Sequence, residues 1–168
     1  MTLAEAAAQA AAFAEAGDER SLAPLRTAWD EEIESAARSH DFRERAIAFR
    51  AVGQFRFRQK IELLRRGLED DSPACRGSAL LSLELLSRDH PSTVNSVRPL
   101  LHTLASADGN EAVRRLAVLC LKNGSPQRET IVLLEGLASS EESDAQLRQA
   151  AANVAQQLKR KQAQTPRR

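Results

Sequence analysis

Arginine and phenylalanine alternate along one short stretch of the sequence, and these residue types can bind anions and nucleic acids. Residues 42–60 read FRERAIAFRAVGQFRFRQK and hold four of the five Phe residues of the chain. Guanidinium groups hydrogen-bond to phosphate oxygens, and aromatic rings stack on bases. The stretch therefore predicts an anion or nucleic-acid contact made by five arginines: Arg43, Arg45, Arg50, Arg56 and Arg58.

A structural interpretation of the same stretch stands beside this one. Phe42, Phe49 and Phe57 fall at helical spacings that suit a buried core, which would leave the arginines on a solvated face. A rough alignment of the predicted helices also places Arg66 opposite Glu31, so ion pairing can account for basic side chains here. A nucleic-acid site would be expected to have a wider basic stripe.

Residue types that catalyse reactions or bind metals form no recognisable site. His40, His90 and His102 are predicted at helix ends or exposed positions, with no second His or Cys three or four residues away. Cys75 and Cys120 lack the paired spacing of a zinc site, and we expect both to be reduced core residues. The glycines are isolated, and no Ser sits in a nucleophile elbow. We therefore expect no enzymatic activity, no metal and no cofactor.

Helices must position these residues. Ala and Leu dominate the apolar residues, Tyr is absent, and no run alternates as a strand would. Turn signals predict an all-α protein of about nine helices in antiparallel pairs, with Thr2 and Ser21 capping the first two. We expect one domain over 1–160 and a disordered basic tail over 161–168. The predicted repeats cover 1–38, 41–70, 72–106 and 110–139, followed by a terminal helix over 144–160.

Alternate helices resemble one another in sequence. Arg76, Arg114 and Arg148 align at spacings of 38 and 34 residues. An apolar residue precedes each Arg, an Ala follows three residues later, and an acidic residue lies six residues before. Arg43 is a weaker fourth copy, with Arg50 in place of the apolar residue seven positions later. We expect these arginines and acidic residues to pair with their neighbours from turn to turn.

This repeated pattern resembles the HEAT family, including the repeat variant found in phycobilisome lyases, over residues 41–155. The resemblance implies a right-handed α-solenoid, a HEAT-like superhelix in which each hairpin buries its apolar face by stacking on the next. It implies little about function, because that family comprises scaffolds, transport receptors, lyases and DNA-binding proteins.

The net charge of +1 conceals acidic and basic segments. Residues 1–41 carry nine acidic and three basic side chains, whereas residues 42–66 carry eight basic and two acidic ones. No apolar stretch approaches the roughly 18 residues that span a bilayer. Glu5 and Glu15 lie where a signal peptide would be basic and then apolar. We therefore expect a cytoplasmic protein with no membrane partner.

Three functional hypotheses follow. The first is a non-catalytic protein-interaction scaffold or adaptor, whose partner is a protein and can be an acidic one, bound on the concave face of the helical stack. The second is a nucleic-acid-binding HEAT-like protein that uses residues 43–66, and the third, a bilin lyase-like chaperone subunit, rests on the resemblance alone. The sequence leaves the oligomeric state open. The predicted concave-face contacts are Lys60, Glu62, Arg66, Asn95, Arg98, His102 and Glu135.

Overall fold

The computed structural model describes residues 1–164. Within that range helices are the only regular secondary structure, which confirms the all-α class. The chain divides into two compact units, Met1–Leu86 and Ser87–Arg168, where the sequence predicts a single domain. In the described range, no helix combines the length and the apolar character that crossing a membrane requires.

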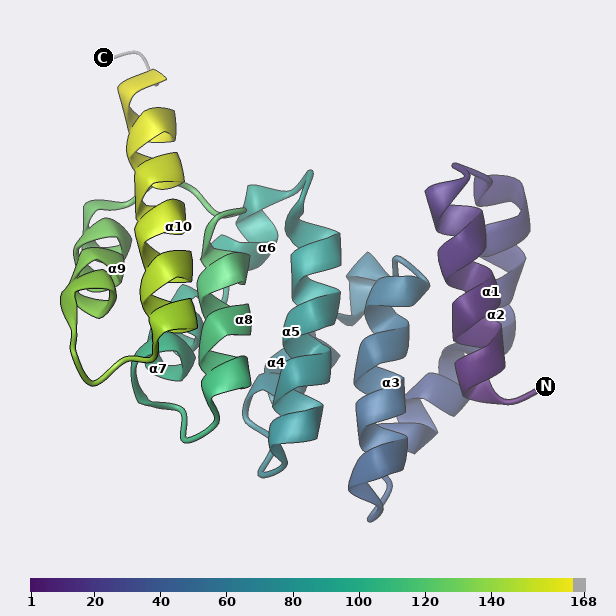
Figure 1. Cartoon of the computed structure of the whole chain (residues 1–168). Helices are drawn as coiled ribbons and strands as arrows, with labels where there is room; N and C mark the ends of the chain where they lie inside the picture. Colours follow the sequence, from purple (N-terminus) through teal and green to yellow (C-terminus); the bar gives the residue numbers. More distant parts are fainter. Residues whose placement is uncertain (165–168) are drawn as a thin grey trace. The chain divides into compact units, whose positions relative to one another are not determined.

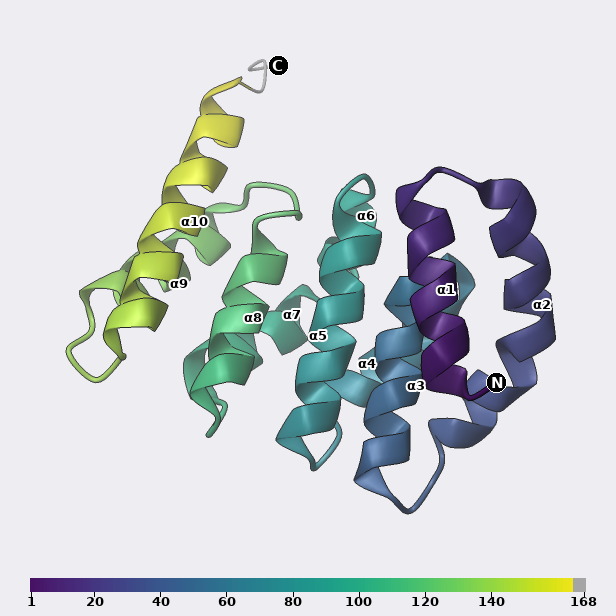
Figure 2. The ribbon, with the colours of Figure 1, turned by 45° about the vertical axis from the view of Figure 1, so that its right-hand side comes forward.

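Three helices that contact one another form the core of the N-terminal unit. α1 (Leu3–Glu15) packs on α2 (Glu19–Ala36) and on α3 (Phe42–Gln54), and α2 also contacts α3 (Figures 1 and 2). A short 3-10 turn, η1 (Arg58–Lys60), leads into α4 (Ile61–Leu68), and α5 (Pro73–Ser87) follows. Because α1 and α3 are antiparallel to α2, the end of α1 and the start of α2 lie near the end of α3.

The C-terminal unit contains the other five helices. α7 packs on α8 and α9, and α10 packs on the same two helices (Figure 1). The bounds are α6 (Pro91–Asn95), α7 (Arg98–Ala107), α8 (Glu111–Leu121), α9 (Arg128–Ser139) and α10 (Ala145–Gln164).

Ten α-helices lie in the described range, where the sequence predicts about nine. The predicted helix that begins at Pro91 is broken at Ser96 and Val97 and resumes as α7. Pro99, in the first turn of α7, has no N–H to donate to a carbonyl four residues earlier, so a continuous helix would lack that bond. At the other end, α10 continues to Gln164, which corrects the prediction of disorder from residue 161. Residues 165–168 of the predicted tail lie outside the described residues.

Side-chain caps set the start of the first two helices. Thr2 and Glu5 form the predicted capping box, with the Thr2 N–H 2.7 Å from Glu5 Oε2 and the Glu5 N–H 3.2 Å from Thr2 Oγ1. The prediction that Ser21 caps the second helix is wrong. Asp18 caps it, because its carboxylate accepts both the backbone N–H and the hydroxyl of Ser21, at 3.1 and 2.6 Å.

Four helices have an arginine at the same position, and each arginine hydrogen-bonds to the turn or helix end that precedes its helix. In α3, α5, α8 and α10, the fourth residue of the helix is Arg. Each of these arginines donates to a carbonyl in the preceding helix end or turn, and the end of a helix leaves such carbonyls without intrahelical partners. The donor and acceptor pairs are Arg45 and Ser39, Arg76 and Asp70, Arg114 and Ala105, and Arg148 and Ser143, at 2.6–3.0 Å.

The N-terminal copy of this arginine is Arg45, and not Arg43 as the sequence alignment predicts. In the frame of Arg45, Ala48 follows three residues later and Val52 seven residues later, and both are fully buried. Arg43 is exposed. The alignment favours Arg43 because an apolar residue, Phe42, precedes it, but Phe42 is 44% exposed and so does not mark the core.

The predicted pairing between neighbouring turns is present in the N-terminal unit. Arg45 Nε lies 2.9 Å from Asp70 Oδ2, and its Nη2 lies 3.1 Å from Asp70 Oδ1. Arg76 Nη1 donates to the backbone carbonyl of the same Asp70 at 2.9 Å. One acidic residue therefore connects the arginine of its own repeat with the arginine of the repeat before it.

Helices α3 and α5 approach each other closely at Gly53. A Cβ atom on Gly53 would lie 2.5 Å from Ser82 Cα and 2.7 Å from Ser82 Oγ. Ser82 is fully buried, and its hydroxyl oxygen accepts the Gly53 N–H at 2.9 Å. The packing of these two helices therefore requires a residue without a side chain at position 53.

Replacing Gly53 with Ala should destabilise the protein by about 1 to 3 kcal/mol, because the added methyl group overpacks the contact. Gly136→Ala in α9 is a matched control, since a Cβ atom there meets nothing within 4 Å and Ala favours a helix by up to about 1 kcal/mol. Chemical denaturation followed by circular dichroism measures both variants. Equal stability of the two variants would contradict the close approach at Gly53.

Candidate functional site

The structure separates the arginines that the sequence groups into one anion contact. Arg43 is exposed at the start of α3, with its guanidinium carbon 5.6 Å from the centroid of the Phe42 ring. Arg45 is held by Asp70, and these hydrogen bonds raise the pKa of Arg45. Arg45 therefore pairs with the turn between α4 and α5, and its role as an anion contact stays a prediction.

Arg50 is partly buried. Its Nη1 atom is buried without a hydrogen-bond partner. Burial lowers the pKa of this guanidinium, and the negative charge of Glu84 only partly opposes that effect. Arg50 and Arg45 therefore do not form a continuous basic surface with the remaining arginines of the stretch.

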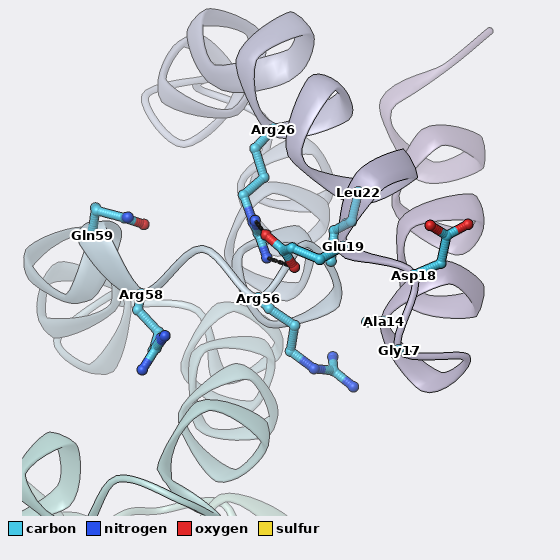
Figure 3. Close-up of a pocket in the computed structure, with 9 residues that line it drawn as sticks. All are labelled: Ala14, Gly17, Asp18, Glu19, Leu22, Arg26, Arg56, Arg58 and Gln59. Atoms are coloured by element: carbon cyan, nitrogen blue, oxygen red, sulfur yellow. Dashed lines mark hydrogen bonds and ion pairs between the residues drawn. The ribbon is translucent and has the colours of Figure 1, made fainter.

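Arg56 and Arg58 instead meet Arg26, which no sequence pattern singles out. They surround a hollow of about 350 Å³ between the end of α1, the first turns of α2 and the segment after α3 (Figure 3). We call this hollow the arginine pocket. Its lining consists of Ala14, Gly17, Asp18, Glu19, Leu22, Arg26, Arg56, Arg58 and Gln59.

Arg26 has a fixed orientation in the arginine pocket. Its Nε donates to the carbonyl of Phe55 at 2.7 Å. Its Nη1 pairs with Oε1 of Glu19, and its Nη2 lies 3.3 Å from Glu19 Oε2, so the carboxylate faces the fork of the guanidinium (Figure 3). These hydrogen bonds hold the pKa of Glu19 below its ordinary value. The side chain of Arg26 is 19% exposed and that of Glu19 is 67% exposed, so the carboxylate is the more accessible partner.

Arg56 has a left-handed backbone conformation, with φ 52°, which residues other than Gly rarely adopt. The Arg56 N–H bonds to the Gly53 carbonyl at 3.0 Å, and the Phe57 N–H bonds to the Val52 carbonyl at 2.9 Å. This is the Schellman arrangement that ends many helices, and it commonly has Gly where Arg56 stands. Gly17, with φ 69°, has the equivalent position after α1 and lines the same pocket.

A second hollow lies at the opposite ends of α1, α2 and α3. It has a volume of about 890 Å³, and we call it the acidic groove. Glu32, Asp41 and Glu44 are exposed carboxylates in its lining, Ile47 is a 39% exposed apolar side chain, and no Lys or Arg lines it. The full lining is Thr2, Leu3, Ala4, Glu32, Ser35, Ala36, Ser39, His40, Asp41, Glu44 and Ile47.

Lys60, a predicted partner contact, is buried instead, with only 8% exposed. Its Nζ lies 2.6 Å from Asp30 Oδ1 and 2.7 Å from Glu34 Oε1, and 4.7 Å from the centroid of the Phe57 ring. Burial by itself would lower the pKa of Lys60, but hydrogen bonds to Asp30 and Glu34 outweigh it and raise the pKa. Lys60 therefore connects η1 to α2 through two ion pairs.

Three other predicted contacts come together as an internal network of the C-terminal unit. Arg98 is 6% exposed, and its guanidinium donates to Thr130 Oγ1 at 3.0 Å, to the Ser125 carbonyl at 3.2 Å and to the side-chain oxygen of Asn95. His102 Nε2 lies 2.9 Å from the Thr130 hydroxyl. The prediction that Arg98 contacts a partner is wrong, because it joins α6 and α7 to α9 and the loop before it.

The remaining predicted contacts are exposed. Glu62 lies 3.5 Å from Arg65, and Glu135 lies 3.1 Å from Lys159. Arg66 forms no ion pair with Glu31 within the described residues, which corrects the predicted pairing. Glu62, Arg66 and Glu135 do not line the arginine pocket or the acidic groove.

In the described part of the chain, no three His, Cys, Asp or Glu residues are placed to hold a metal ion. Cys75 and Cys120 are buried free thiols, and burial raises the pKa of Cys75. No protein-family model matches the chain, and no curated protein matches it. A functional assignment therefore rests on the geometry of the two hollows.

Lys60→Ala should destabilise the protein by about 1 to 2 kcal/mol, because Asp30 and Glu34 would face each other without their buried counter-charge. Arg66→Ala is the matched control, since Arg66 is an exposed cation on the neighbouring α4, and such a change should cost less than about 0.5 kcal/mol. Urea denaturation compares the variants. Similar losses would show that Lys60 has no special role in the fold.

His102 should make stability depend on pH. Burial lowers its pKa, Glu129 opposes this effect, and Arg98 adds to it. Because the unfolded chain, with a His pKa of about 6.5, then binds the proton more readily, stability should fall as the pH falls below about 6.5. His102→Gln should remove this part of the pH dependence, while His40→Gln, at an exposed position, should keep it. Denaturation at about pH 7.5 and 5.5 tests this, and equal pH dependence in His102→Gln and the parent protein would contradict it.

Proposed function

We propose that this chain is a non-catalytic scaffold that binds a basic segment of a partner protein in the acidic groove. In this proposal the helices form a HEAT-like, right-handed solenoid of antiparallel pairs. The recurrence of one arginine contact before α3, α5, α8 and α10 supports such a repeat. The cytoplasmic location and the absence of enzymatic activity remain predictions from the sequence.

The acidic groove is the observation that carries the proposal. Its exposed carboxylates include Glu32 and Glu44, and none of the residues that line it is a Lys or an Arg. Apolar side chains lie beside these carboxylates, among them Ile47, which is 39% exposed, and Leu3, which is 7% exposed. A ligand that matches this lining carries Lys or Arg residues and at least one apolar side chain that can bury against Ile47.

This occupant differs from the acidic partner that the sequence suggests. Two of the basic side chains on which that hypothesis depends, Lys60 and Arg45, are bound to carboxylates of the chain itself. These internal ion pairs do not favour the wide basic stripe that nucleic-acid binding would need. Among residues 1–164, no specific contact favours a bilin lyase-like chaperone.

A labelled synthetic peptide of alternating Leu and Lys tests the acidic groove by fluorescence anisotropy. We expect saturable binding to the full chain, weakened about tenfold or more by Ile47→Asp or by Glu44→Lys, since each places the wrong chemistry against the peptide. Val132→Asp is the matched control, because Val132 is 60% exposed and lies in the C-terminal unit.

Two results would contradict the proposed groove. One is equal weakening of peptide binding by Ile47→Asp and Val132→Asp. The other is equally tight binding of a Leu and Glu peptide, which would show that the carboxylates of the acidic groove do not select the ligand. Circular dichroism of each variant checks that it is folded.

A further inference from the structure

We propose that Arg50 binds a carboxylate of the partner segment that occupies the acidic groove. The groove then selects a segment in which a basic, an apolar and an acidic side chain follow one another in that order. This inference rests on the proposed function, because it describes the same partner segment more closely. Arg50 lies three residues after Ile47, which lines the groove, and residues three apart are neighbours on the surface of a helix.

Arg50 is a cation whose hydrogen-bonding groups are not used by the described part of the chain. Its Nη1 atom is buried and has no hydrogen-bond partner, and its side chain forms no hydrogen bond or ion pair within residues 1–164. The charge of Glu84 on α5 acts on Arg50 but does not outweigh burial, which lowers the pKa of Arg50. Because buried polar groups are nearly always paired, an unpaired guanidinium points to an acceptor supplied by a ligand.

One edge of the Arg50 guanidinium is open to a ligand. The residue is half-buried. Its Nε and Nη2 atoms, like Nη1, are unpaired within the described residues, but unlike Nη1 they are not buried. Nε and Nη2 form one edge of the guanidinium, and a carboxylate binds such an edge through two parallel hydrogen bonds. A carboxylate can therefore approach Arg50 from the solvent.

The order of side chains along α3 defines the order that the ligand must match. Glu44, Ile47 and Arg50 form a row at intervals of three residues, and the first two are exposed in the acidic groove. The row presents a negative, an apolar and a positive contact over about 9 Å of helix. An extended segment spans this length with about three residues. A segment with basic charges alone would bring a like charge to Arg50, whereas an acidic side chain there complements it.

Binding of three labelled peptides to the full chain, measured by fluorescence anisotropy, tests this contact. The first peptide alternates Leu and Lys. In the other two, the Lys nearest one end is replaced by Glu or by Gln, and the pair is made for each end because the direction of the bound segment is open. At one end, we expect the Glu peptide to bind about five- to tenfold more tightly than the Gln peptide, since only Glu offers a charged acceptor to Arg50.

Variants of Arg50 separate a contact with the ligand from a structural role. Arg50→Gln should abolish the preference for Glu over Gln and leave binding of the Leu and Lys peptide within about twofold, because Arg50 does not hold the lysines. Arg50→Lys should keep part of the preference, since the charge remains without the planar fork. Arg43→Gln is the matched control, because it removes an exposed cation of the same helix, and the preference should persist. Circular dichroism checks that each variant is folded.

Two results would overturn the assignment of Arg50 and leave the acidic groove in place. One is equal affinity for the Glu and Gln peptides at both ends, while Ile47→Asp still weakens binding of the Leu and Lys peptide. The other is a preference for Glu that Arg43→Gln removes and Arg50→Gln keeps. Failure of all the peptides to bind, or binding that Ile47→Asp does not weaken, would instead overturn the proposed groove and this inference with it.

Discussion

The end of each helix leaves backbone carbonyls without intrahelical partners, and the way this chain satisfies them organises both of its units. An arginine at the fourth position of α3, α5, α8 and α10 reaches back to a carbonyl of the turn or helix end before it. In α3 this arginine is Arg45, which also forms an ion pair with Asp70. Arg45 therefore connects the turn before α3 with the turn before α5. The Schellman turns at Gly17 and Arg56 satisfy other carbonyls through backbone N–H groups. Both of these residues line the arginine pocket.

Two cations are buried in the fold and depend on their hydrogen-bonding partners. Lys60 and Arg98 lie almost entirely out of solvent, and burying a charge is costly unless hydrogen-bonding partners surround it. Lys60 has two carboxylates, whereas Arg98 has neutral oxygen acceptors from Thr130, Ser125 and Asn95. These partners are part of the fold, so both side chains stabilise loops and helices and do not belong to an exposed recognition surface.

The three helices of the N-terminal unit have opposite chemistry at their two ends. Carboxylates such as Glu32 and Glu44 gather at one end beside Ile47, and Arg26, Arg56 and Arg58 gather at the other. In the sequence, acidic residues 1–41 and basic residues 42–66 appear as two blocks. Because α1, α2 and α3 run in alternating directions, the fold redistributes these blocks, and two hollows of opposite charge result.

The sequence by itself determined the helical class, most helix positions and the repeat at Arg76, Arg114 and Arg148, because periodicity, caps and turn residues act within a few positions. It misplaced the N-terminal copy at Arg43, since an apolar neighbour in the sequence does not reveal burial. Only the tertiary structure decided which cations are buried and that Arg26 joins Arg56 and Arg58. Arg26 is oriented by the carbonyl of Phe55, 29 residues away. Contacts over such separations depend on how helices pack, and helical periodicity carries no information about which side chains then meet.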